Sequence, residues 1–121
     1  MNVKRDEVEG YPEVVVLHVE GVLDTYTSDK FREEFGDLLK KYRFFAVNME
    51  KVEYVSSMGW GVLVQSIYRA RREDGELVLV NLRPQVARIF RIMGFSSLFK
   101  HFTDLDDAVR YLIKEGNLKT R

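Results

Sequence analysis

Hydrophobic residues gather in short segments along this chain, and their spacing predicts strands and helices in alternation. Nearly continuous apolar runs rich in β-branched residues are typical of strands covered on both faces, and a weaker alternation near the N-terminus indicates an edge strand. Five strands are predicted in this way, at 3–8, 14–20, 44–47, 76–80 and near 100–102. The turn at 10–12 is short, so the first two strands should be antiparallel.

Apolar residues recur at helical spacing in the segments between and after these strands. The predicted helices run from about 25 to 42, 57 to 72, 84 to 93 and 105 to 115. This order of elements predicts one α/β domain over 1–116, with a mixed sheet of four to five strands and about four helices. Residues 117–121 follow the last helix and are predicted to form a flexible C-terminal tail.

Polar residues and glycines set the expected ends of these elements. Gly21 is expected to end the first long strand, and a hydroxyl at 25–27 to cap the helix that follows. Asn48 is expected to close the next strand, with a loop at 50–53. The last helix is expected to begin with a capping box at 103–106. In the third helix, the spacing predicts that the inward-facing residues are Val86, Ile89, Phe90 and Met93.

Composition narrows the chemistry that this domain can perform. Nineteen Lys and Arg balance nineteen Asp and Glu, which gives no reason to expect a nucleic acid or a membrane as partner. The absence of cysteine excludes disulfides, thiolate nucleophiles and thiolate metal sites. His18 and His101 lack a second ligand at metal spacing and are expected to be structural. With no apolar run of membrane-spanning length and no signal-like N-terminus, we expect a cytoplasmic monomer that folds without metal or cofactor.

The segment 55–63 places two hydroxyls, two glycines and a tryptophan at the predicted start of a helix. Free backbone N–H groups and the positive end of the helix dipole favour an anion there, so a serine can carry a phosphate without disturbing the fold. At about 100° per residue, the inward stripe comprises Gly59, Val62, Leu63, Ser66, Ile67 and Ala70. The opposite side comprises Ser57, Gly61, Val64 and Tyr68.

Three residues of this helix and Asp24, which precedes the first predicted helix, each have a structural as well as a functional interpretation. Gly61 costs roughly 1 kcal/mol in a helix relative to alanine, which either the approach of a partner or packing against a loop of the same chain would explain. Trp60 lies on the flank of the inward stripe, as core edge or as an exposed interface anchor. Asp24 begins a turn and caps the next helix, or belongs to the functional site. Ser57 is a helix cap or a reactive hydroxyl.

The ordered set of motifs resembles the STAS domain family, and in particular bacterial anti-sigma factor antagonists. The segment that carries the family's signature reads VEYVSSMGWGVL at 52–63. Four further segments match the family's pattern in the same order, at 21–24 (GVLD), 75–79 (GELVL), 84–94 and 106–109 (DDAV). The resemblance therefore extends over nearly the whole chain.

The resemblance implies a partner switch controlled by phosphorylation. The unphosphorylated domain of such a protein binds an anti-sigma factor that is also a serine kinase, and so releases a sigma factor for transcription. Phosphorylation of one serine at the helix start ends this binding until a serine phosphatase reverses it. Ser57 matches the phosphoacceptor, and Asp24 matches an acidic residue near it. The expected partner-binding residues are Asp24, Thr25, Ser56, Ser57, Met58, Trp60, Gly61, Val64 and Tyr68.

Three residues depart from the family's pattern. Ser56 stands where Asp is common, Met58 where Ser or Ala is common, and Asn48 where an Asp usually ends the strand. Two carboxylates near the site are therefore expected to be missing, which reduces repulsion against a phosphate and alters what a kinase recognises. Ser56 is the alternative phosphoacceptor, and the register favours Ser57.

Two other classes of function compete with the switch. Serine catalysis needs a histidine base and an orienting carboxylate, and Val55 stands where a Gly-x-Ser-x-Gly elbow requires glycine, so an enzyme is not expected. The other class is a STAS-like module that binds a nucleotide or lipid, or an accessory subunit of a transporter or signalling scaffold. In that case the helix start would hold the anionic group of a ligand in place of a covalent phosphate.

Overall fold

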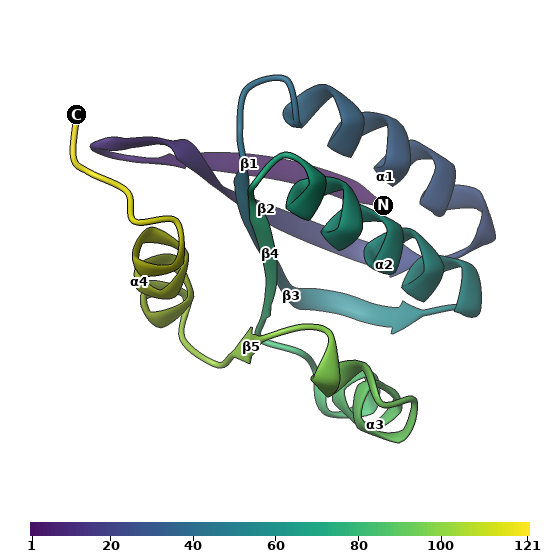
Figure 1. Cartoon of the computed structure of the whole chain (residues 1–121). Helices are drawn as coiled ribbons and strands as arrows, with labels where there is room; N and C mark the ends of the chain where they lie inside the picture. Colours follow the sequence, from purple (N-terminus) through teal and green to yellow (C-terminus); the bar gives the residue numbers. More distant parts are fainter.

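A five-stranded mixed sheet forms the centre of the computed structural model, which describes all 121 residues (Figure 1). The strands lie side by side in chain order, as β1 (Asn2–Val8), β2 (Tyr11–Leu23), β3 (Phe44–Val55), β4 (Glu76–Val80) and β5 (His101–Phe102). The pair β1 and β2 is antiparallel, and every later pair is parallel. The predicted α/β fold with a mixed sheet is confirmed, and so is the antiparallel first pair.

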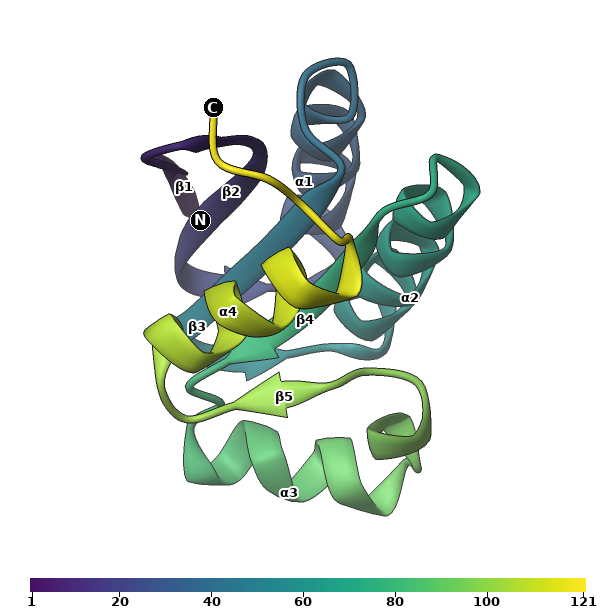
Figure 2. The ribbon, with the colours of Figure 1, turned by 60° about the vertical axis from the view of Figure 1, so that its left-hand side comes forward.

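Four α-helices cover the sheet, as α1 (Thr25–Leu38), α2 (Ser57–Arg72), α3 (Pro84–Ile92) and α4 (Leu105–Glu115). The helices α1 and α2 lie over one face of the sheet, and α4 covers the other (Figure 2). The helix α3 and the short 3₁₀ turn η1 (Phe95–Ser97) lie beyond β5, at the periphery of the molecule (Figures 1 and 2). All four helices begin within a few residues of their predicted starts.

Alternate residues of the central strands build two hydrophobic cores, one on each face of the sheet. Val15 and Leu17 of β2 belong to the larger core, under α1, α2 and α3, whereas Val14 and Val16 belong to the smaller core under α4. This double coverage explains why the strand reads as a continuous apolar run. Full burial of each such side chain stabilises the fold by roughly 1.5–3 kcal/mol.

The two longest strands extend further than the sequence predicts. Gly21 does not end β2 but lies within it, with a φ of 100°. The predicted loop at 50–53 is part of β3, and Asn48 lies inside that strand rather than at its end. The pairing register of β2 and β3 shifts twice along this stretch, which marks β-bulges. A bulge interrupts the two-residue alternation by which a strand is identified in a sequence.

Two helix boundaries also differ from the prediction. The helix α1 ends at Leu38 rather than near 42, and the buried Tyr42 beyond it donates its hydroxyl hydrogen bond to Glu7 at 2.6 Å. The N-cap of α4 is Asp104, whose side chain accepts from the Asp106 N–H at 2.8 Å, so the predicted capping box at 103–106 is not formed. A tertiary hydrogen bond thus holds Tyr42 beyond the end of α1, and a local one caps α4.

The helix α3 buries only part of its predicted inward face. Val86 and Phe90 are buried, but Ile89 is 43% exposed and Met93 is 61% exposed. Beside α3 the sheet ends in β5, which is only two residues long, so little of the sheet is available to cover this helix. The sequence prediction for Ile89 and Met93 is therefore wrong.

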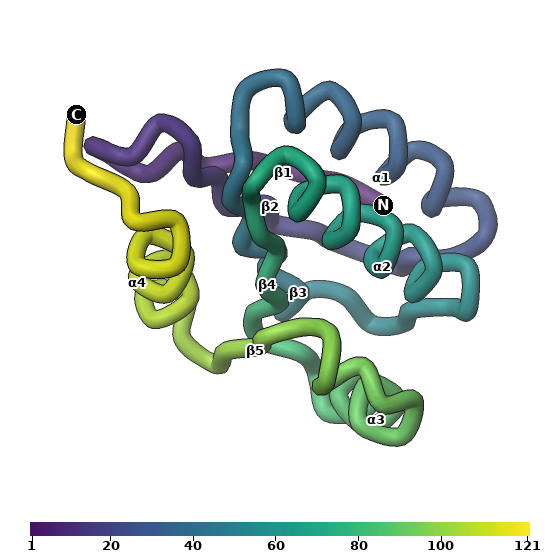
Figure 3. The backbone as a smooth tube through the Cα atoms, viewed as in Figure 1, coloured from purple at the N-terminus to yellow at the C-terminus, as the bar shows by residue number.

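The C-terminal residues lie beside the turn between β1 and β2 (Figure 3). The Arg121 N–H donates to the Gly10 carbonyl at 2.8 Å, and the hydroxyls of Tyr11 and Thr120 are 3.4 Å apart. The segment predicted as a tail thus contacts the first hairpin of the domain, although it forms no regular element.

Candidate functional site

The starts of α1 and α2 lie at the same end of the molecule (Figure 1). Each helix directly follows one of two paired parallel strands, and Leu23 at the end of β2 is paired with Val55 at the end of β3. The Ser56 N–H donates to the Leu23 carbonyl at 2.9 Å. The loop that holds Asp24 and Thr25 therefore adjoins the first residues of α2.

Gly59 permits this close approach of α2 to the end of β2. A Cβ atom at this position would stand 2.3 Å from the carbonyl oxygen of Leu23 and 2.9 Å from the side chain of Val55. Both distances are far shorter than a van der Waals contact, and the nearer atom belongs to the backbone. The fold itself therefore requires glycine at this position.

The two serines at the start of α2 have different roles. Ser56 is the N-cap, and its hydroxyl oxygen accepts from the Gly59 N–H at 3.1 Å. Ser57 is the first residue of the helix and is exposed to solvent. Its hydroxyl makes no hydrogen bond within the chain. The capping role considered for Ser57 thus belongs to Ser56, and the Ser57 hydroxyl is free.

Asp24 caps the start of α1. Its carboxylate accepts from the N–H groups of Tyr26 and Thr27, at 3.0 Å each, and the Thr27 hydroxyl accepts from the Asp24 N–H at 2.9 Å. The hydrogen bond from the Thr27 N–H is the main reason why the pKa of the Asp24 carboxyl lies below its ordinary value of 3.8. A carboxylate that is ionised at neutral pH therefore stands next to the start of α2.

The outer face of α2, as we call it from here on, consists of Ser57, Gly61, Val64 and Tyr68. No atom lies within 4 Å of the point where a Cβ of Gly61 would stand, so packing against a loop of the same chain does not explain this glycine. Tyr68 is 50% exposed and Met58, next to Ser57, is 49% exposed. Tyr26, on the neighbouring start of α1, is 89% exposed and was not singled out from the sequence.

Residues 6–108 match the family model of the STAS domain. The chain belongs to the STAS domain family. This match covers both strand ends and both helix starts that form the site. The resemblance that the ordered sequence motifs carry is confirmed.

Named STAS relatives of this chain are anti-sigma factor antagonists. The chain is 29% identical over 101 residues to the anti-sigma-B factor antagonist of Listeria monocytogenes, in an alignment that covers 83% of this chain and 89% of the relative. It is 30% identical over 83 residues to the anti-sigma-B factor antagonist of Staphylococcus aureus, which covers 68% of this chain and 77% of the relative. These relatives are regulatory binding proteins.

The fold is similar to that of the anti-sigma factor antagonist SpoIIAA from Bacillus. The unphosphorylated form of that protein matches with a TM-score of 0.79 and 18% identity, over 93% of this chain and 97% of that one. Its phosphorylated form matches with a TM-score of 0.69 and 18% identity, over 91% and 98%. These likenesses confirm the predicted STAS fold.

Trp60 belongs to the core of this STAS domain and not to its surface. It is 5% exposed, and its ring lies 5.0 Å from that of Phe95 and 6.0 Å from that of Phe90. Its indole N–H is buried without a hydrogen-bond partner. The structure therefore favours the core-edge interpretation of Trp60, and its inclusion among the partner-binding residues is corrected.

Asn48 lies away from Ser57, so the expectation that a carboxylate is missing there from the site is wrong. Asn48 and Val55 are seven positions apart in β3, which corresponds to about 23 Å of extended chain. The Asn48 side chain is buried and hydrogen-bonded to the ring of His18 at 3.0 Å, and His18 in turn bonds Asp6 at 2.9 Å. Only the departure at Ser56 thus removes a carboxylate from the site itself.

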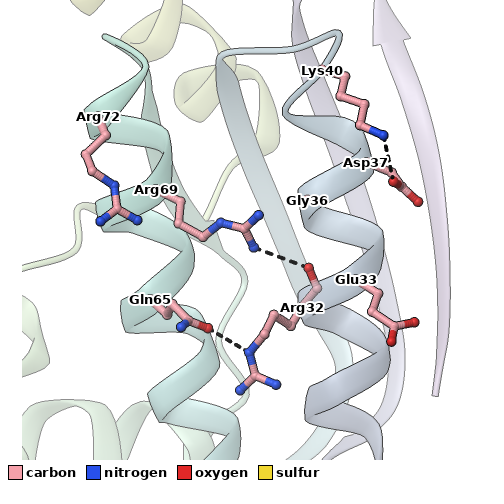
Figure 4. Close-up of a pocket in the computed structure, with 8 residues that line it drawn as sticks. All are labelled: Arg32, Glu33, Gly36, Asp37, Lys40, Gln65, Arg69 and Arg72. Atoms are coloured by element: carbon pink, nitrogen blue, oxygen red, sulfur yellow. Dashed lines mark hydrogen bonds and ion pairs between the residues drawn. The ribbon is translucent and has the colours of Figure 1, made fainter.

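A polar groove runs between α1 and α2, beyond the helix starts (Figure 4). It measures about 740 Å³, and Arg69 crosses it next to Gly36 to donate to the Arg32 carbonyl at 3.3 Å. No cluster of His, Cys, Asp and Glu could hold a metal ion, and no helix is long and apolar enough to cross a membrane. No hydrophobic side chain lines the groove between α1 and α2, whereas sites for small organic ligands are mostly apolar. The groove therefore lacks the apolar lining that is typical of a site for a small organic ligand.

Proposed function

We propose that this STAS domain is an anti-sigma factor antagonist that works as a partner switch. In its unphosphorylated state it binds an anti-sigma factor with serine kinase activity, and the sigma factor held by that protein is released. Phosphorylation of Ser57 ends the binding, and a serine phosphatase restores it. These partners act together in the cytoplasm, and the domain itself performs no catalysis.

The observation that carries the proposal is the free, exposed hydroxyl of Ser57 beside the engaged hydroxyl of Ser56. A kinase must bring the accepting oxygen into line with the γ-phosphate of ATP, which an exposed hydroxyl on the first helical residue permits. The Ser56 hydroxyl holds the Gly59 N–H, so its modification would disturb the start of α2. The geometry thus favours Ser57 over Ser56 as the phosphoacceptor.

A phosphate on Ser57 is compatible with the fold. It adds about −1.5 to −2 charges at neutral pH, and the free N–H groups and dipole at a helix start stabilise negative charge. The structural likeness to both forms of SpoIIAA fits this expectation, since that protein keeps the fold when phosphorylated. The switch should therefore act on the interface and not on the folding of the domain.

The proposed partner surface surrounds Ser57 with small polar residues and with the large, half-exposed side chains of Met58 and Tyr68. It comprises Asp24, Thr25, Ser56, Ser57, Met58, Gly61, Val64 and Tyr68. A partner that packs against the neutral hydroxyl would meet a solvated dianion after phosphorylation. The desolvation of this dianion costs more free energy than its contacts with the partner would provide. The ionised Asp24 adds to the negative charge at this place. Binding should therefore weaken sharply.

The test compares three variants with the purified anti-sigma factor of the same organism. Ser57→Ala should fold, bind this partner constitutively and incorporate no phosphate from radiolabelled ATP. Ser57→Asp should keep a near-wild-type melting temperature and bind poorly. Ser56→Ala is the matched control, and it should still be labelled.

Labelling that persists in Ser57→Ala and disappears in Ser56→Ala would move the switch one residue back. If neither serine affects labelling or affinity, the phosphorylation switch is wrong and a ligand-binding module takes its place.

A further inference from the structure

The outer side of α3 exposes an apolar surface that the fold leaves uncovered. Ile89, Ile92 and Met93 are 43%, 67% and 61% exposed, and their spacing of three and four residues places them together on the helix. They make up three of the seven large hydrophobic residues that the whole molecule exposes. A helix that protrudes with apolar residues at this spacing has the form of an anchor for a groove on a partner (Figure 1).

The segment of the chain that carries this surface is basic, although the exposed Glu50 and Glu53 of β3 lie beside the start of α3. Residues 77–103 contain Arg83, Arg88, Arg91 and Lys100 but no Asp or Glu, a net charge of +4. The remaining 15 basic and 19 acidic residues give the rest of the chain a net charge of −4. The neutral total therefore conceals a basic segment that includes α3.

The cations on α3 are available to a partner. Arg88 and Arg91 are exposed, and neither is part of any ion pair in the structure. Together with Ile89, Ile92 and Met93 they form what we call the α3 patch. An arginine can bind a carboxylate through two parallel hydrogen bonds, so the chemistry of the patch fits an apolar hollow edged by Asp and Glu.

Two other occupants fit the patch less well. A second copy that docked through the same patch by two-fold symmetry would place arginines opposite arginines. A membrane surface usually attracts Trp or Tyr beside the basic residues, and the exposed residues of the patch include no aromatic side chain. An acidic protein surface is the occupant that both the charge and the side chains favour.

The helix that carries the patch packs against the start of α2. Trp60 of α2 packs against Phe90 of α3 and Phe95 of η1, and the Gln85 side chain donates to the Glu53 carbonyl at 3.2 Å, close to the end of β3. These contacts place α3 next to the element that carries Ser57, so one partner of ordinary size is expected to span both.

We infer that the anti-sigma factor covers the α3 patch as well as the start of α2, and that it meets this patch with an apolar hollow edged by carboxylates. This inference rests on the proposed function, because it extends the contact of the same partner. It divides the surface into one part that senses phosphorylation and a second part that supplies affinity and orientation by charge.

The test measures the affinity of the purified anti-sigma factor for unphosphorylated variants. Arg88→Glu/Arg91→Glu and, separately, Ile92→Ser should each weaken binding by about tenfold or more, as for residues that contribute to an interface. The matched control is Arg110→Glu/Lys114→Glu on α4, on the opposite face of the sheet, which should leave the affinity unchanged. All changed residues are exposed, and thermal melting should show that every variant folds.

Salt provides a second readout. Affinity of the wild-type chain should fall with ionic strength more steeply than that of Arg88→Glu/Arg91→Glu, since exposed charges are screened over about 8–10 Å at physiological salt. Equal slopes, or equal affinities of the α3 variants and the wild type, would overturn the inference and leave the Ser57 switch intact. The alternative outcome is that the wild-type chain binds phosphatidylglycerol vesicles. If Arg88→Glu/Arg91→Glu abolishes vesicle binding but leaves the affinity for the anti-sigma factor unchanged, the patch is a membrane surface and the inference is overturned. Absence of any wild-type complex would refute the proposed function and this inference with it.

Discussion

The inner and outer sides of the first two turns of α2 differ although the sequence gives both a glycine. On the inner side, a Cβ of Gly59 would collide with the Leu23 carbonyl at 2.3 Å. On the outer side, a Cβ of Gly61 would meet no atom within 4 Å. Trp60 between them is buried, whereas Ser57 at the start of the helix is exposed.

The difference shows that one glycine serves the fold and the other does not. Packing determines the inner residue, because the backbone of β2 occupies the space of a side chain. Nothing within the chain explains the outer glycine, which lowers the stability of the helix by roughly 1 kcal/mol relative to alanine. The proposed contact with a partner would explain it, and substitutions on the two sides should therefore have opposite effects.

The largest effect is expected from Gly59→Ala. The added methyl group would force the start of α2 away from Leu23, which overpacks the site at a cost of about 2–3 kcal/mol. The melting temperature should fall by about 10 °C, measured by circular dichroism.

Partner affinity of the residual folded Gly59→Ala protein should also fall, since Ser57 moves with the helix. A melting temperature equal to that of the wild type would show that the close contact between α2 and β2 is not a constraint on the fold.

A smaller effect is expected from Ser56→Ala, which removes the N-cap of α2. The Gly59 N–H loses its acceptor, and the loss of such a cap typically costs about 1 kcal/mol. The midpoint of urea unfolding should shift accordingly without a change in slope. Ser57→Ala should cause no such shift, because the Ser57 hydroxyl has no hydrogen-bond partner to lose. A shift of the same size in Ser57→Ala would show that the N-cap assignment to Ser56 is wrong.

The same contrast explains how much of the fold and of the site could be predicted from the sequence. Helical spacing correctly assigned Gly59 to the inner side and Gly61 to the outer side, because the position of a residue in the helical repeat determines the direction of its side chain. The repeat does not indicate which atoms lie in that direction. The collision at Gly59 involves Leu23, which is 36 positions away in the chain, and only the pairing of β2 with β3 brings the two residues together.

The missed features share this dependence on distant parts of the chain. The ends of β2 and β3 were placed too early because bulges break the alternation of the strands. Ile89 and Met93 were assigned to the core because the spacing is helical and the residues are apolar, but the short β5 offers α3 little surface to cover. The order of elements was predictable because each element carries its own periodicity.

The smallest effect on the fold, and an opposite one, is expected from Gly61→Gln. Glutamine is a better helix former than glycine, so the free energy of unfolding should rise by roughly 0.5 kcal/mol. The side chain should extend into open space on the outer face, where it would occupy the volume that the partner needs. The variant should therefore have a slightly higher melting temperature than the wild type and bind the anti-sigma factor poorly, as measured by calorimetry. Gly61→Ala is the matched control, because it also improves helix propensity but adds only a methyl group at the same position. If Gly61→Gln unfolds the domain, Gly61 is a packing residue after all; if it folds and binds as tightly as the wild type, the outer face of α2 does not contact the partner.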